Sequence, residues 1–86
     1  MKEIIISCND VNVLNDAIRQ DINQLRRTNI DFKVSLRESK IYIPTSKKTI
    51  IYATLENTEI KLIGRRNCEV LYSHSYNIEE IIKESE

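Results

Sequence analysis

The sequence has little of what tight turns and catalytic sites require. Its 86 residues include one glycine, one proline and one histidine, and no tryptophan. A phosphate-binding loop needs several glycines, so Gly64 alone cannot form one. A catalytic nucleophile needs a base beside it, but the side chains of Ser73 and Ser75 diverge from that of their neighbour His74. We therefore expect no catalytic residue and no enzymatic activity.

Cysteine is scarce as well, and Cys8 and Cys68 lie far apart and outside any CxxC pattern. A secreted domain of this size usually contains several disulfides, which favours two reduced and mostly buried thiols here. A single disulfide between them is the alternative. A zinc site needs four soft ligands, which one histidine and two cysteines do not supply. We expect no metal and no cofactor.

Long apolar runs are also absent. Runs such as 4–8 (IIISC) and 70–72 (VLY) are far shorter than the about 20 apolar residues that a membrane-spanning helix needs. We expect no membrane contact and a location in the cytoplasm, which is the host cytoplasm if the chain is viral. With 41% apolar and 30% charged residues, the composition fits one globular domain over 1–86. Because so small a domain has a thin stability margin, a homo-oligomer is one expected option.

The sequence does contain a series of β-forming segments. Residues 2–7 (KEIIIS) and 69–72 (EVLY) lack alternation, which is typical of strands buried on both faces. They are predicted to be parallel neighbours in the interior of the sheet. Lys47 and Lys48 are expected in a solvated hairpin loop. Further strands are predicted where Ile, Val, Tyr or Thr is enriched between turn-forming or charged residues, namely at 30–37, 40–43, 49–55 and 59–63.

A long amphipathic helix is predicted over about 10–28. Its apolar residues recur at spacings of three and four and form one stripe: Val11, Leu14, Ile18, Ile22 and Leu25. A short second helix is expected over about 78–85, where Asn77 and Glu80 form a capping pair. These elements predict an α/β or α+β fold, with a small mixed sheet of five to six strands and the long helix on one face.

The formal net charge is zero, but the charges are unevenly distributed. Residues 19–66 contain eleven lysines and arginines against five acids, whereas residues 67–86 contain one lysine against five glutamates. Solvated faces explain such an asymmetry most simply. The alternative is a patch that contacts nucleic-acid phosphates, formed by Arg65, Arg66, Lys47, Lys48, Arg26 and Arg27. Tyrosines would add base stacking if two of them shared an exposed sheet face.

The order of elements resembles a known family. A strand that ends in a small residue (IIISCN) precedes a helix, a meander (KIYIPTSKKTIIYATLEN), the segment IKLIGRR and the strand EVLYSHSYNIEEI. This succession resembles the middle of the ATPase core of viral DNA-packaging terminases and related helicases, over nearly the whole chain. The family's Walker A loop would lie upstream of Lys2 and is absent, and Ser73 and His74 stand where its Walker B acids would be. The resemblance implies the fold of that core without ATPase activity.

The function is therefore predicted mainly by exclusion. We expect a small non-enzymatic regulator or inhibitor that binds another protein. A composition rich in Asn, Ile and Lys, as in AT-rich genomes, favours a viral or mobile-element origin. The alternative is a nucleic-acid-binding module that uses the basic patch described above.

Overall fold

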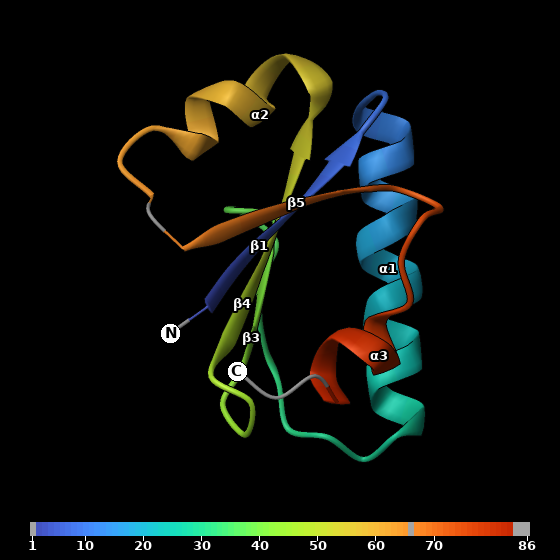
Figure 1. The fold of residues 1–86 in the computed structure, drawn as a ribbon. Helices are drawn as coiled ribbons and strands as arrows, with labels where there is room; N and C mark the ends of the chain where they lie inside the picture. The colour runs from blue at the N-terminus through green and yellow to red at the C-terminus, as the bar shows by residue number, and fades with distance from the viewer. Residues whose placement is uncertain (1, 66, 84–86) are drawn as a thin grey trace.

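A computed structural model describes residues 2–65 and 67–83, and Figure 1 shows one sheet flanked by helices. Five strands form the sheet in the order β2-β3-β4-β1-β5. The elements are β1 (Lys2–Cys8), α1 (Val11–Arg27), β2 (Lys33–Ser35), β3 (Lys40–Ile43), β4 (Lys48–Thr54), α2 (Leu55–Leu62), β5 (Cys68–Tyr72) and α3 (Ile78–Lys83). The predicted α/β class and the mixed sheet are confirmed, and the sheet has five strands where five to six were predicted.

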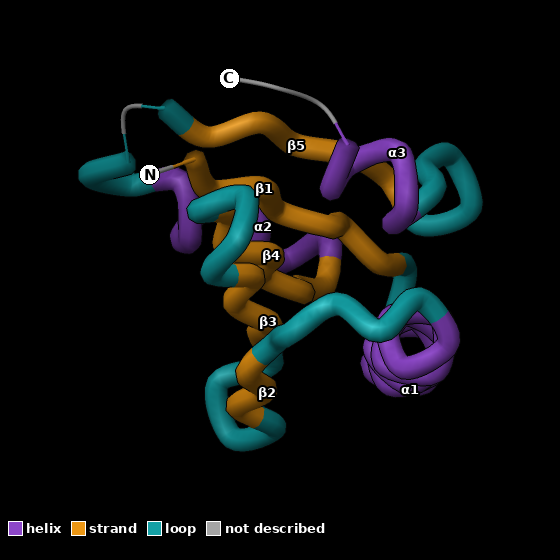
Figure 2. The backbone as a smooth tube through the Cα atoms, turned by 90° about the horizontal axis from the view of Figure 1, so that it is seen from below, coloured by secondary structure: helices purple, strands orange, loops and turns teal. Residues whose placement is uncertain are grey.

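The sheet combines parallel and antiparallel pairs. β1 is parallel to both β4 and β5, whereas β2 pairs with β3, and β3 with β4, in the antiparallel direction. α1 and α3 pack on one face, and α2 packs on the opposite face (Figure 2). Parallel strands cannot be joined by a tight turn and need longer crossover connections. α1 lies in the connection that follows β1, and α2 lies in the connection between β4 and β5.

The isoleucines of β1 are buried on both faces, as their lack of alternation predicts. Ile4, Ile5 and Ile6 are all 0% exposed. Ile4 and Ile6 belong to the larger core beneath α1, and Ile5 belongs to a smaller core beneath α2. A central strand between two helical layers explains this run of three apolar residues.

α1 begins and ends near its predicted limits. The carboxylate of Asp10 caps it by accepting a hydrogen bond from the N–H of Val13 at 2.9 Å. After the last turn, Asn29 has a φ of 58°, which is the left-handed conformation that ends many helices. Leu14 and Leu25 lie on the buried stripe between these ends.

The strand predicted at 59–63 is wrong, because α2 occupies this segment. The strand was predicted because isoleucine is enriched in this segment, between turn-forming and charged residues. Leu62 packs against the smaller core, but Ile60 is 66% exposed. The connection between β4 and the parallel strand β5 requires a crossover, and this tertiary demand outweighs the local pattern.

Two other strand predictions need correction. Of residues 30–37, only Lys33–Ser35 pair with β3, and Ile30 and Phe32 reach the core from the preceding loop. Residues 69–72 do pair in parallel with β1, but β5 forms an edge of the sheet rather than part of its interior. Its side chains are correspondingly half-buried or exposed.

The two thiols are free, as predicted, and Cys8 is fully buried. Cys8 ends β1, whereas Cys68 pairs with Glu3 near the beginning of that strand. The two cysteines therefore lie toward opposite ends of the sheet, beyond the roughly 7 Å between Cα atoms that a disulfide spans.

Candidate functional site

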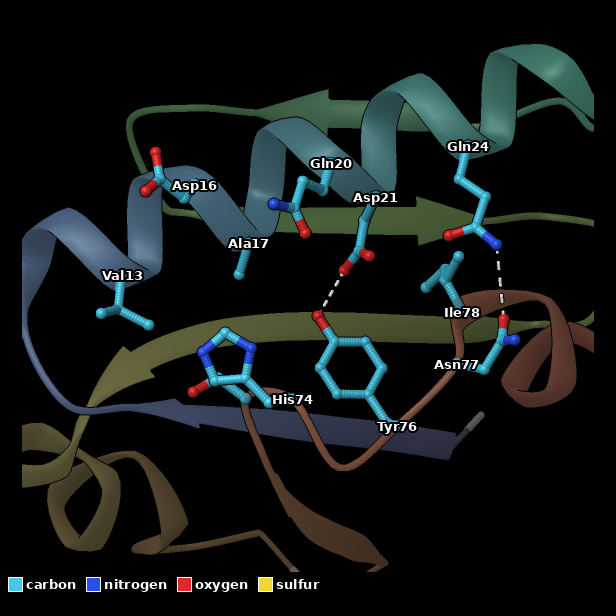
Figure 3. A pocket seen from close by; sticks show the side chains of 11 residues that line it. Val13, Asp16, Ala17, Gln20, Asp21, Gln24, His74, Tyr76, Asn77 and Ile78 are labelled. Carbon is cyan, nitrogen blue, oxygen red and sulfur yellow. Dashed lines mark hydrogen bonds between the residues drawn. The ribbon is translucent and has the colours of Figure 1, made fainter.

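A groove of about 420 Å³ lies between α1 and the segment that joins β5 to α3, and we call it the α1 groove (Figure 3). On one side it is lined by Val13, Asp16, Ala17, Gln20, Asp21 and Gln24 of α1. On the other side it is lined by residues 73–78 apart from Ser75. Its volume is in the range of sites that hold small molecules or single side chains.

The helical repeat explains why α1 presents these residues together. Their spacings of three and four place them on one flank of the helix, beside the stripe that faces the sheet. Asp16 and Gln20 are exposed on this flank, whereas Val13 and Ala17 are half-buried. The α1 groove therefore combines apolar side chains with polar groups that can select a ligand.

Asp21 forms the polar centre of the groove and is only 6% exposed. Tyr52 of β4 and Tyr76 each donate a hydroxyl hydrogen bond to Oδ2 of Asp21, the second at 2.6 Å. Burial raises the pKa of the Asp21 carboxyl above its usual value, and the two hydrogen bonds oppose part of that rise. Burial also raises the pKa of both tyrosines, so they remain hydroxyl donors. This network joins the helix, the sheet and the β5–α3 segment.

A second contact fixes the far end of that segment. Gln24 donates from Nε2 to Oδ1 of Asn77 at 3.4 Å, as Figure 3 shows. The same oxygen accepts the N–H of Glu79 at 2.9 Å, which supports Asn77 as the predicted cap of α3. α3 is described to Lys83, and the last two residues of its predicted range lie outside the described residues. Two side chains of α1 therefore hold the wall opposite them.

The charge of the groove is negative. Asp16 and Asp21 line it, and within the described chain no lysine or arginine does. Both tyrosine hydroxyls donate to Oδ2 of Asp21, and no hydrogen bond among the described residues uses Oδ1. An acceptor oxygen is therefore left for a ligand that donates hydrogen bonds.

The described members of the predicted basic patch do not form one surface. Arg65 bonds Glu3 with its guanidinium and donates from Nε to the carbonyl of Lys61 at 2.6 Å. Lys48 belongs to β4 and is only 1% exposed, so its expected place in a solvated loop is wrong. Its ammonium donates to the carbonyl of Ile81 in α3.

The remaining basic residues are spread over the molecule. Arg26 and Arg27 are exposed in the last turn of α1, which lies on one face of the sheet. α2, and Arg65 after it, lie on the opposite face. Lys47 is exposed in the β3–β4 turn, and Arg66 lies outside the described residues. The geometry thus separates Arg26 and Arg27 from Arg65 by the thickness of the sheet.

The tyrosines divide between two environments. Tyr52 and Tyr76 belong to the Asp21 network beneath the α1 groove. Tyr42 and Tyr72 lie on the opposite face of the sheet, since they alternate with β3 and β5 residues that face α1. Two strands, β4 and β1, separate them, so they do not form one stacking platform.

The periodicity of α1 contains a signal for Asp21 that the predictions above did not use. Asp21 follows Ile18 by three residues and precedes Leu25 by four, and therefore falls on the buried stripe. A carboxylate at such a position needs hydrogen-bond donors. The identity of these donors depends on tertiary contacts that the spacing does not reveal.

Residues 2–65 and 67–83 contain neither a metal-binding cluster nor a membrane-spanning helix. No group of three or more His, Cys, Asp or Glu residues there has a metal-binding arrangement. None of the described helices has the length and apolar character needed to cross a membrane.

Comparison with known proteins adds no assignment. No protein-family model matches the chain, and neither a curated protein nor a solved structure matches it significantly. The resemblance to terminase ATPase cores therefore stays a prediction.

Proposed function

We propose that this chain is a non-enzymatic protein-binding regulator, and that the α1 groove holds an arginine side chain of its partner. The observation that supports this most is that both Asp16 and Asp21 line the groove, whereas no lysine or arginine is among its described lining residues. A cationic side chain would complement this charge. The viral or mobile-element origin stays a prediction from composition.

The chemistry of the groove favours a guanidinium over an ammonium. A guanidinium has five N–H donors in a plane, and carboxylate and amide oxygens are its usual acceptors. Asp16 offers a carboxylate, and Gln20 and Gln24 add amide oxygens on the same flank of α1. Tyr76 adds an aromatic ring, on which a guanidinium can stack.

The proposal predicts that the neutral isostere of arginine binds more weakly. We expect N-acetyl-arginine N-methylamide to bind with a dissociation constant of about 1 mM, equivalent to about −4 kcal/mol. The citrulline analogue has the same shape without the charge and should bind more weakly. Asp16→Asn should weaken binding of the arginine compound by about three- to tenfold. Titration followed by ¹H–¹⁵N chemical shifts measures both differences.

Asp31→Asn is the matched control, because Asp31 is an exposed aspartate in the loop after α1 and does not line the groove. It should leave arginine binding unchanged. Equal affinity for the arginine and citrulline compounds would show that the groove does not select a guanidinium.

A second candidate function rests on the uncovered half of the other sheet face. A shallow hollow of about 350 Å³ there is lined by Lys33, Lys40 and Tyr42, and by three neighbouring residues. Lys33 and Tyr42 are direct cross-strand partners. An aromatic ring between two lysines is a feature of single-stranded nucleic-acid binding, although Lys40 is paired with Glu38 at 2.6 Å.

Oligonucleotide binding separates the two candidates. If protein binding is the main function, oligonucleotides should bind with dissociation constants no tighter than the non-specific range of about 10⁻⁴–10⁻⁶ M. The double variant Arg65→Ala/Arg66→Ala should then bind oligonucleotides as weakly as the unmodified chain. Nucleic-acid binding on the open face predicts that Tyr42→Ala costs about 1–3 kcal/mol on single strands. Titration at about 50 mM and 200 mM salt, with single-stranded and duplex probes, measures both effects.

A further inference from the structure

The two edges of the sheet differ in how well they are protected. β2 forms one edge with only three residues, and Lys33 on it is exposed. β5 forms the other edge with the five residues CEVLY, which include no lysine and no proline. Short edge strands and edge lysines prevent pairing between molecules. Only β2 has these features.

The backbone of β5 directs every second residue outward. The N–H of Ser73 donates to the carbonyl of Ser7, and the carbonyl of Asn67 accepts a hydrogen bond from the N–H of Glu3. The backbone N–H and C=O groups of the odd-numbered residues therefore point towards β1. Backbone groups alternate in direction along a strand. The N–H and C=O groups of Cys68 and Val70 and the N–H of Tyr72 therefore point to the open edge. The carbonyl of Tyr72 instead accepts hydrogen bonds from the N–H of Ser75 at 3.1 Å and from its hydroxyl at 2.6 Å.

We propose that β5 pairs with β5 of a second copy of this chain, antiparallel about a two-fold axis at Val70. The outward residues are symmetric about this position, because Cys68 and Tyr72 lie two residues to either side. The two-fold axis places Val70 opposite itself and Cys68 opposite Tyr72 of the second copy. The N–H of Val70 then meets the carbonyl of Val70 of the second copy, and the N–H of Tyr72 meets the carbonyl of Cys68. Both copies make the same contacts, as an isologous interface requires.

Charge and apolar surface fit this occupant. Glu69 is the charged residue of β5, and it would stand opposite Leu71 rather than opposite an identical charge. Lys2 of the same chain already pairs with it at 3.2 Å. Tyr72 is 60% exposed, and the pairing would place its ring beside Cys68 of the second copy, which packs in a cluster with Leu62. An otherwise solvated aromatic side chain would become covered.

Val70→Pro tests the pairing without removing a hydrogen bond to β1, because the N–H of Val70 points outward. We expect the unmodified chain to rise from a mass of 10.1 kDa towards twice that value with concentration in sedimentation equilibrium. Val70→Pro should weaken the dimer by at least about tenfold, since it removes the two central hydrogen bonds. Its far-UV circular dichroism should match that of the unmodified chain. A chain that stays monomeric to millimolar concentration would overturn the proposal.

Cross-linking provides a readout that does not depend on proline. In a Cys68→Ser background, Val70→Cys places two thiols across the axis, at about 5.5 Å between Cα atoms, within reach of a disulfide. Oxidation should then yield a covalent dimer. The native Cys68 thiols would lie about 14 Å apart along the strands and should not cross-link. A dimer that forms no disulfide at position 70 would exclude this register.

Discussion

Asp21→Ala should lower the free energy of unfolding by about 2–4 kcal/mol, because it leaves two tyrosine hydroxyls without their acceptor. Tyr52 is 1% exposed and Tyr76 is half-buried, so water does not fully replace the lost bonds. Urea unfolding followed by far-UV circular dichroism measures the change. Asp16→Ala, on the exposed flank of the same helix, should change stability by no more than about 0.5 kcal/mol.

The same network predicts a pH dependence. Burial raises the pKa of Asp21 in the folded protein above the usual value of 3.8, so the folded state holds this proton more tightly than the unfolded state. The protonated Asp21 carboxyl therefore stabilises the folded state at low pH, and this contribution to stability is lost as the pH rises from 3.8 through the folded pKa. Asp21→Asn does not ionise, so the stability of the unmodified chain relative to this variant should fall over that interval. A constant difference would contradict the burial of the carboxylate.

Lys48→Ala should also destabilise the protein, by about 2–4 kcal/mol. Lys48 is 1% exposed, and its ammonium donates to the carbonyl of Ile81 in α3. The change therefore takes this donor away from the Ile81 carbonyl and leaves a void in the core. Lys48→Met fills most of the space without donating, and should lie between the alanine variant and the unmodified chain. Hydrogen exchange at Ile78 and Ile81 should become faster in both variants.

The neighbouring Lys47 provides the control. It is exposed in the turn before β4, so Lys47→Ala should change the unfolding free energy by no more than about 0.5 kcal/mol. Equal effects of the two alanine substitutions would contradict a structural role that is specific to Lys48.

Sequence patterns predict the parts of this fold whose local signal agrees with their tertiary role. The run Ile4–Ile6 indicates a strand covered on both faces, and the apolar stripe of α1 indicates a helix on a sheet. α2 shows the opposite case. Its residues Ile60 and Leu62 alternate with charged residues as in a strand, but the crossover between parallel strands decides its structure.

The candidate site is less predictable, because its contacts join distant parts of the chain. Asp21 meets Tyr52 and Tyr76 across 31 and 55 residues. The position of Asp21 on the buried stripe indicates a need for donors but not their identity. Lys48 has a clearer signal, because the period of two from Ile50 places it on the face beneath α1. The adjacent Lys47 suggested a loop instead.

The most direct test of the α1 groove is an NMR nuclear Overhauser measurement with N-acetyl-arginine N-methylamide near saturation. The groove predicts contacts from the arginine side-chain methylenes to the methyl group of Ala17 and the ring of Tyr76, which lie on its two walls. It also predicts that the citrulline compound gives much weaker contacts at the same concentration. Contacts to Tyr42 on the opposite face, without contacts to Ala17 or Tyr76, would contradict the groove as the binding site.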